Sequence, residues 1–235
     1  MIAMLVAAAV CPCPPLIVPE VAAGAAAELD ALRAACGEAV GELLGSGAEL
    51  IVVVGTGPKA EVWTEGGAGS FRRYGVDLAV RLPAAGVNGP ELAPSLTVGA
   101  WLLAEAGATV PAHACAVRAD TAPQRLHGLG RGLAELADRV GLLVLGGGSA
   151  CRSVKAPGYW DERSEAYDAA AAAALGAADT AALAALDPQL SAELQADGRA
   201  PWQVLAGAAE GAGLTGRLRY DDAPYGVGYL VASWR

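Results

Sequence analysis

The stretch "ELIVVVG" (residues 49–55) decides the fold. It is a continuous apolar, largely β-branched run between a charged residue and a glycine, with no polar position inside it that could face water. A strand of this kind is buried on both faces, which is typical of the centre of a parallel sheet. We therefore take this run as a central strand and look for its neighbours along the chain.

Strand-like and helix-like segments alternate on both sides of this run. Buried strands are predicted at residues 4–10 and 141–149, and further strands at 77–82, 108–117 and within 216–234. Helices are predicted at residues 20–44, 91–106, 123–139 and 161–186, with shorter helices within 187–209, whereas residues 66–88 are mainly loop. This alternation predicts one α/β domain over residues 1–235, with a largely parallel sheet covered by helices on both faces.

The charge and hydropathy of the chain exclude several classes of protein. The formal net charge is −9 and no run of lysine and arginine occurs, so nucleic acid is not an expected partner. The apolar N-terminus has no basic segment before it and leads into a proline-rich turn, unlike a signal peptide. No apolar stretch approaches the ~20 residues that span a bilayer. We expect a cytoplasmic bacterial protein with no membrane partner.

The five cysteines are odd in number and irregular in spacing, which favours free thiols over a disulfide framework. Cys11 and Cys13 follow the first strand, and Cys151 follows the triple glycine at the end of the strand predicted at 141–149. In a doubly covered sheet, ligands gather beyond the carboxyl ends of the strands. The loops at 11–15, 55–58 and 146–152 all qualify, and they could converge in one crevice.

The thiols in these loops allow two interpretations. Cysteine is commonly a small buried apolar side chain, and packing alone explains it. Alternatively, Cys11 and Cys13 point the same way in an extended Cys-x-Cys, and Arg152 beside Cys151 favours a thiolate there. Three thiols in one crevice would bind a soft or borderline metal ion. The chain has only two histidines, so a three-histidine zinc site is impossible.

Four segments resemble one protein family, the class III extradiol ring-cleavage dioxygenases. "CPCPPLIVPE" (11–20) resembles the segment near the N-terminus of that family in which a histidine stands between prolines before an apolar run and Pro-Glu. "LIVVVGTGP" (50–58), "LVLGGGSACR" (143–152) and "APYGVGYLVA" (223–232) resemble later segments of the family in the same order. Proteins like the protocatechuate 4,5-dioxygenase beta chain and Memo-type proteins share this fold, so the resemblance implies an α/β fold with a mixed sheet.

The resemblance also implies an activity whose residues this chain has changed. The family uses Fe(II), held by two histidines and a glutamate, to insert O₂ into a catechol ring, and a further histidine acts as acid and base. Cys13 and Thr56 stand at the two metal histidines and Cys151 at the acid/base histidine. Asp221 and Asp222 lie near the glutamate position without a clear match. An ordinary dioxygenase needs two imidazoles and a carboxylate, so we do not expect one.

The first functional hypothesis is an enzyme of altered chemistry, or a metal-binding protein, in the ancestral cleft. Cys13 and Cys151 would be catalytic residues, either as nucleophile and helper or as ligands, with Cys11, to a divalent metal ion (Fe, Zn or Cu). The remaining candidates would bind a small-molecule substrate: Thr56, Arg152 and Lys155, the last two through an anionic group, and Tyr159 or Trp160 as an aromatic wall. Everything in this hypothesis requires Cys13 and Cys151 to meet in one pocket.

Two alternatives stay open. One is a non-catalytic small-molecule-binding or scaffold descendant that keeps only the fold, which the loss of every histidine ligand favours. The other is a true ring-cleavage dioxygenase with unconventional ligands. The resemblance makes a homodimer plausible under each of them.

Overall fold

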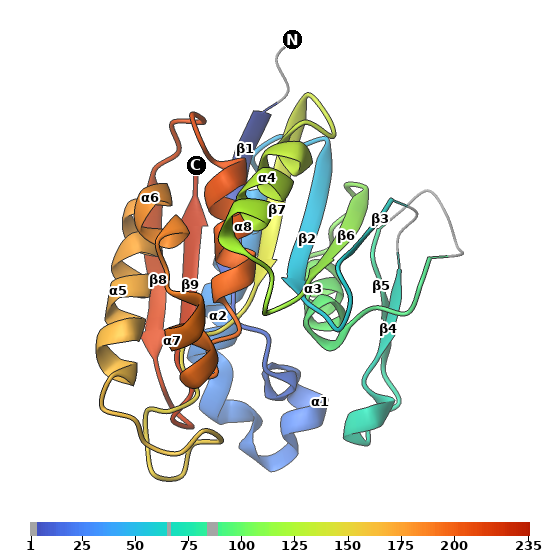
Figure 1. Cartoon of the computed structure of the whole chain (residues 1–235). Helices are drawn as coiled ribbons and strands as arrows, with labels where there is room; N and C mark the ends of the chain where they lie inside the picture. The colour runs from blue at the N-terminus through green and yellow to red at the C-terminus, as the bar shows by residue number, and fades with distance from the viewer. Residues whose placement is uncertain (1–3, 65–66, 84–88) are drawn as a thin grey trace.

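The central strand predicted from the sequence lies in the middle of a seven-stranded sheet as β2 (Leu50–Thr56). The structure is a computed structural model that describes residues 4–64, 67–83 and 89–235. The strands of the sheet lie in the order β3-β6-β2-β7-β1-β9-β8 (Figure 1). Their bounds are β1 (Met4–Cys11), β3 (Glu61–Trp63), β6 (Ala112–Val117), β7 (Arg139–Leu145), β8 (Gly216–Asp222) and β9 (Tyr229–Trp234); a separate pair joins β4 (Ala68–Ser70) to β5 (Ala79–Arg81).

The four inner strands β6, β2, β7 and β1 are parallel, and antiparallel strands close both edges. β3 pairs with β6 at one edge, while β9 and then β8 extend the sheet beyond β1. Val54 of β2 lies between Cys115 of β6 and Val144 of β7. The carboxyl ends of the parallel strands therefore meet at one edge, the lower edge in Figure 1. The predicted α/β fold with a mixed, largely parallel sheet is confirmed.

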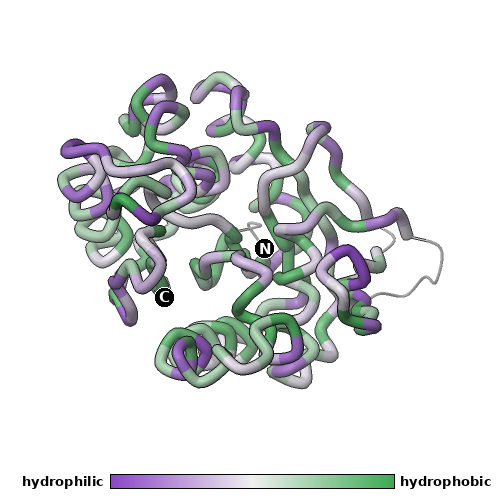
Figure 2. The backbone as a smooth tube through the Cα atoms, turned by 90° about the horizontal axis from the view of Figure 1, so that it is seen from below, coloured by the Kyte–Doolittle hydropathy of each residue, from purple (hydrophilic) through white to green (hydrophobic). Residues whose placement is uncertain are grey.

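Helices cover both faces of the sheet, and each face has its own apolar core. Alternate residues of β2 separate the two cores, since Val53 packs into one and Val54 into the other. Figure 2, viewed from below, shows many hydrophobic residues toward the middle of the molecule and hydrophilic residues mostly at its periphery. One face carries α2 (Asp30–Leu44) and α3 (Pro94–Glu105); the other carries α4 (Pro123–Ala134), α5 (Ser164–Ala177) and α8 (Arg199–Ala208), with α6 (Thr180–Ala184) and α7 (Pro188–Glu193) packed outside α8 and below it.

Two long predicted helices are interrupted in the structure. Residues 20–44 form α1 (Pro19–Ala22), a 3₁₀ segment η2 (Ala23–Leu29) and α2, because Ala23 has a φ of 49° that breaks the helical ladder. Residues 161–186 divide into α5 and α6 at Ala178, which is left-handed. Asp179 then caps α6, since its side chain accepts from the Ala182 N–H at 2.9 Å. The helical character predicted for these two ranges is confirmed, but each range is divided at a residue with a positive φ.

The region between β2 and α3 combines a confirmed strand with two unpredicted ones. β5 lies within the predicted strand at 77–82, whereas β3 and β4 are three residues long and have too little apolar pattern to be recognised. Part of the predicted loop, residues 66 and 84–88, falls outside the described residues. Among the helices in the described ranges, none has the length and apolar character needed to cross a membrane.

Candidate functional site

The proline-rich loop after β1 presents Cys13 at the carboxyl edge of the sheet. Pro14 is extended and Pro15 opens the short 3₁₀ helix η1 (Pro15–Ile17), whose turn closes when Ile17 N–H donates to the Pro14 carbonyl at 3.0 Å. Proline fixes φ and removes an N–H donor, so this loop is stiff. The glycine loop after β7 lies beside it, because Gly146 N–H donates to the Cys11 carbonyl at 3.0 Å.

A third segment, the connection between α7 and α8, brings Asp197 to the same place. The Gly147 N–H donates to Asp197 Oδ1 at 2.6 Å, and the Cys13 Sγ lies 3.8 Å from Asp197 Oδ2 as a donor. Cys13 is half-buried, whereas Asp197 is exposed. One carboxyl group therefore joins the loops that follow β1 and β7.

The surroundings of this pair raise the pKa of both groups. Crowding by protein atoms, followed by the charge of Asp197 and the hydrogen bond to it, raises the pKa of the Cys13 thiol well above its ordinary value. Desolvation also raises the pKa of Asp197, although the hydrogen bonds from Gly147 and Cys13 oppose it. The buried phenol of Tyr229, at the start of β9, has a pKa of about 12, chiefly from burial, with smaller contributions from neighbouring charges that include Asp197 and Cys13. Cys13 and Asp197 can therefore share a proton, and their surroundings do not activate the Cys13 thiol as a thiolate.

A buried carboxylate holds the glycine loop in place. Asp168 of α5 accepts from Ser149 N–H at 2.6 Å and Ser149 Oγ at 2.8 Å, and Arg152 Nη1 donates to it at 3.1 Å. A Cβ at Gly148 would lie 2.5 Å from Asp168 Oδ1, and one at Gly228 would be closer still to Oδ2, so both positions require glycine. Burial raises the pKa of Asp168, while these hydrogen bonds lower it. The glycine loop, which contacts Asp197 through Gly147, thus depends on a second carboxylate, that of Asp168.

The predicted meeting of Cys13 with Cys151 is not formed. Cys151 is buried in a separate apolar cluster with Tyr167 and Leu194, and its thiol donates to the carbonyls of Leu194 at 3.4 Å and Gly158 at 3.6 Å. Burial raises its pKa, so Arg152 does not activate it. Arg152 instead pairs with Asp168.

The predicted three-thiol metal site is also absent. Cys11 is buried in the core under α2, where its thiol forms a hydrogen bond with that of Cys36 that raises the Cys36 pKa. Within residues 4–64, 67–83 and 89–235, no group of three or more His, Cys, Asp or Glu side chains is placed to hold a metal ion. Cys13 and Asp197 supply two donors, and the residue at position 56 is a threonine, which is a poor ligand for Fe(II). The residues present do not fit the iron that the resemblance implies.

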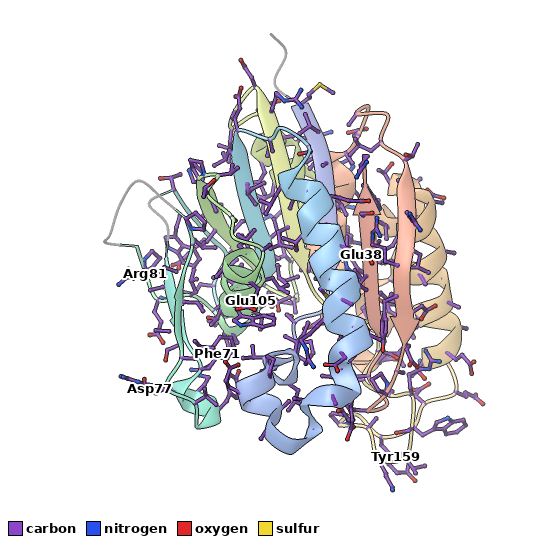
Figure 3. The ribbon with its side chains drawn as sticks, turned by 180° about the vertical axis from the view of Figure 1, so that it is seen from behind. Glu38, Phe71, Asp77, Arg81, Glu105 and Tyr159 are labelled. Atoms are coloured by element: carbon purple, nitrogen blue, oxygen red, sulfur yellow. The ribbon has the colours of Figure 1, made fainter. Side chains whose placement is uncertain are left out.

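In the described part of the chain, none of the predicted substrate-binding residues forms a hydrogen bond or ion pair with Cys13 or Asp197. Thr56 ends β2 and its carbonyl accepts from Ser95 Oγ at 2.6 Å. Lys155, Tyr159 and Trp160 lie on the loop after Cys151. Tyr159 and Trp160 are 63% and 55% exposed, so they face solvent instead of forming a wall. Figure 3 shows Tyr159 at the outside of the molecule. Their roles in binding stay predictions that this geometry does not favour.

A cavity of about 330 Å³ opens beside Asp197. The loop after β6 forms one side of it and α7 with the start of α8 forms the other. Its walls are mostly small apolar side chains, and its lining residues are Ala119, Asp120, Pro188, Gln189, Ser191, Ala192, Ala196, Asp197, Arg199 and Ala200. Arg199 is buried and donates to the carbonyls of Ala119 and Thr121 and to Gln203 Oε1, which ties the two sides together.

Sequence reasoning missed both carboxylates of this region. Asp197 stands in a short Asp-Gly connection between helices, and nothing in its neighbourhood marks it as a partner of Cys13. Asp168 could have been recognised from the sequence. It lies three residues before Ala171 and seven before Leu175, so it shares the apolar face of its predicted helix. A charged residue on a buried helical face indicates a buried hydrogen-bond network.

Comparison with known proteins adds a distant structural likeness. No family model and no curated protein matches the chain. The crystal structure of uncharacterized protein JW3007 from Escherichia coli K12 is similar, with 13% sequence identity and a TM-score of 0.48 over 97% of this chain and 99% of that chain.

Proposed function

We propose that this chain is a small-molecule-binding protein on an extradiol-dioxygenase-like scaffold, and that its ligand occupies the cavity beside Asp197. The observation that supports this most is the double role of Asp197. Its carboxyl group is fixed by the Gly147 N–H and the Cys13 thiol, and the residue also lines a cavity of about 330 Å³. Sites for small ligands are clefts of this size with a few placed polar groups in an apolar lining.

The cavity favours a compact, largely apolar ligand with one hydrogen-bonding group. Alanine and proline side chains form most of the wall, while Gln189 and Asp197 offer polar atoms. Because the pKa of Asp197 is raised, its carboxyl group remains a donor to a higher pH than an ordinary aspartate. A ligand carbonyl or hydroxyl facing Asp197 would meet a group able to donate or accept.

The proposal departs from ring cleavage and from metal binding because of the donor set. Cys13 and Asp197 are two donors, and Cys151 is committed to backbone carbonyls in another cluster. Anaerobically purified protein titrated with Fe(II) or Zn(II) should give no stoichiometric binding isotherm. Catechol and protocatechuate with added Fe(II) should give no ring-cleavage product.

The binding proposal is tested by filling the cavity. Ala192 of α7 is exposed at the cavity, so Ala192→Trp should block it without disturbing the core, whereas Ala181→Trp makes the same change on α6 outside the cavity. A fragment library is screened against the wild type by ligand-observed NMR. Hits that lose their signal with Ala192→Trp and keep it with Ala181→Trp support the proposal. Hits that are insensitive to both variants, or no hits, contradict it.

An acid–base enzyme is the second candidate, favoured by the raised pKa values of Cys13 and Asp197. A carboxyl group with a raised pKa can act as a general acid closer to neutral pH than an ordinary aspartate. Any ligand found in the screen is incubated with the wild type and with Asp197→Asn, and products are sought by mass spectrometry. Turnover that the substitution abolishes would establish catalysis, and an unchanged ligand would leave binding as the function.

We further propose that the protein acts in the cytoplasm and binds neither nucleic acid nor membranes. The net charge of −9 and five unpaired cysteines support this. A homodimer stays a prediction, which light scattering of the purified protein would test.

A further inference from the structure

A second cavity lies at the opposite end of the sheet from Cys13. It has a volume of about 720 Å³ and lies between α2 and the strands β8 and β9. Figure 3, viewed from behind, shows Glu38 on α2 beside these strands. The lining is strongly charged, and consists of Val6, Glu38, Gly41, Glu42, Gly45, Ser46, Arg217, Arg219 and Arg235.

A bulge in β8 shapes the arginine side of this cavity. Leu218 pairs with Ala232 and Tyr220 with Val231, so Arg219 is the extra residue between them. Bulges re-aim side chains next to functional sites. Arg219 here turns toward α2, where its Nη1 donates to Glu38 at 2.7 Å, while its Nε donates to Ser233 Oγ of β9 at 2.9 Å.

The ion pairs of the cavity leave guanidinium groups available to a ligand. Arg219 has little capacity left to bind a ligand. Its Nη2 lies 2.5 Å from Glu42 in an ion pair, and its side chain is 5% exposed. Arg235 shares Glu42 through Nη2 at 3.1 Å and is 64% exposed. Arg217 is exposed and has no ion pair or side-chain hydrogen bond with the described part of the chain. Glu42 is shared by two arginines, which hold its pKa below its usual range.

The helix side of the cavity gives a ligand room. Gly41 of α2 lines it, and an added Cβ there would meet nothing within 4 Å. The cavity therefore combines open volume, three guanidinium groups and two carboxylates. An excess of positive charge in one cavity is unexpected in a chain whose net charge is −9.

We propose that this cavity binds a small oxyanion, through bidentate hydrogen bonds from Arg217 with support from Arg235. Planar guanidinium groups match the geometry of phosphate and carboxylate oxygens, and Arg219 with its two glutamates fixes the wall against which the anion rests. The site is independent of the function proposed for the Asp197 cavity, because it uses none of the same residues and lies at the other end of β1.

Titration with inorganic phosphate and, separately, with succinate tests this site and distinguishes phosphate from carboxylate ligands. Binding is followed by calorimetry and by the rise in Tm at constant ionic strength. We expect saturable binding of at least one probe, weakened about tenfold or more by Arg217→Ala, because a charge-assisted hydrogen bond is lost. Arg235→Ala should weaken it less. Glu38→Gln should strengthen it, because one carboxylate leaves the cavity.

Arg125→Ala is the matched control, since Arg125 is exposed on α4 on the other face of the sheet. It removes the same charge and should leave the affinity unchanged. Equal losses of affinity in Arg125→Ala and Arg217→Ala would show a general charge effect and overturn the proposal. The proposal would also be overturned if neither phosphate nor succinate bound saturably to the wild type. Circular dichroism confirms that each variant is folded.

Discussion

The thiol of Cys13 lies 3.8 Å from the Asp197 carboxylate oxygen Oδ2, although 184 positions separate the two residues in the chain. The contact exists because β1 and β7 end at the same edge of the sheet and the α7–α8 connection crosses that edge. A thiol and a carboxyl group, both with raised pKa values, thus meet at this edge of the sheet.

Replacing Asp168 should destabilise the whole glycine loop. Asp168→Ala leaves the Ser149 groups and Arg152 without their acceptor, and loss of one partner of a buried pair costs about 3 kcal/mol. Glu165→Ala, at an exposed position of the same helix, is the control and should change stability by less than about 0.5 kcal/mol. Urea unfolding measures both; similar values for the two variants would show that the Asp168 network is not stabilising.

A methyl group at Gly148 should be as damaging as a core defect. The added Cβ of Gly148→Ala would lie 2.5 Å from Asp168 Oδ1, and overpacking of this kind costs about 1–3 kcal/mol. Gly128→Ala is the matched control on α4, where an added Cβ meets nothing within 4 Å. That variant should gain about 0.5–1 kcal/mol from helix propensity. Opposite changes in Tm are therefore expected, and a neutral Gly148→Ala would contradict the packing described.

The raised pKa of Asp197 gives stability a defined dependence on pH. The folded state binds the Asp197 proton more tightly than the unfolded state, so the contribution of this group to the free energy of unfolding falls as pH rises through and above the ordinary aspartate range. Asp197→Asn cannot ionise and should lack this fall. The difference in unfolding free energy between wild type and variant, measured by urea at several pH values, should favour the variant increasingly as pH rises. A difference that is constant with pH would show that the Asp197 pKa is not raised.

The sheet could be predicted because its central strands are continuous apolar runs. Residues 49–55 and 141–149 have no polar position inside these runs before their glycines, and both lie in the sheet where burial on two faces is complete. The interruption at Ala23 could not be predicted, since alanine gives no sign of a positive φ. β3 was not predicted because its three residues are too few to show the alternation of apolar and polar side chains that marks a strand.

Half of the candidate site could be predicted, because Cys13 stands directly after a strand in a proline-stiffened loop. Its partner Asp197 could not, since the contact depends on how two helices pack far along the chain. The prediction for Cys151 is wrong because adjacency in sequence is not adjacency in space: Arg152 turns to Asp168, and the Cys151 thiol turns into a separate apolar cluster.

The alkylation of Cys13 by iodoacetamide, followed by mass spectrometry across a pH series, tests the proton-sharing pair most directly. Cys13→Ser supplies the background from the buried thiols. In the wild type, the midpoint of the rate should lie well above that of an ordinary thiol, and Asp197→Asn should move it to lower pH, because a negative charge and its hydrogen bond are removed. An ordinary midpoint that Asp197→Asn leaves unchanged would contradict the account.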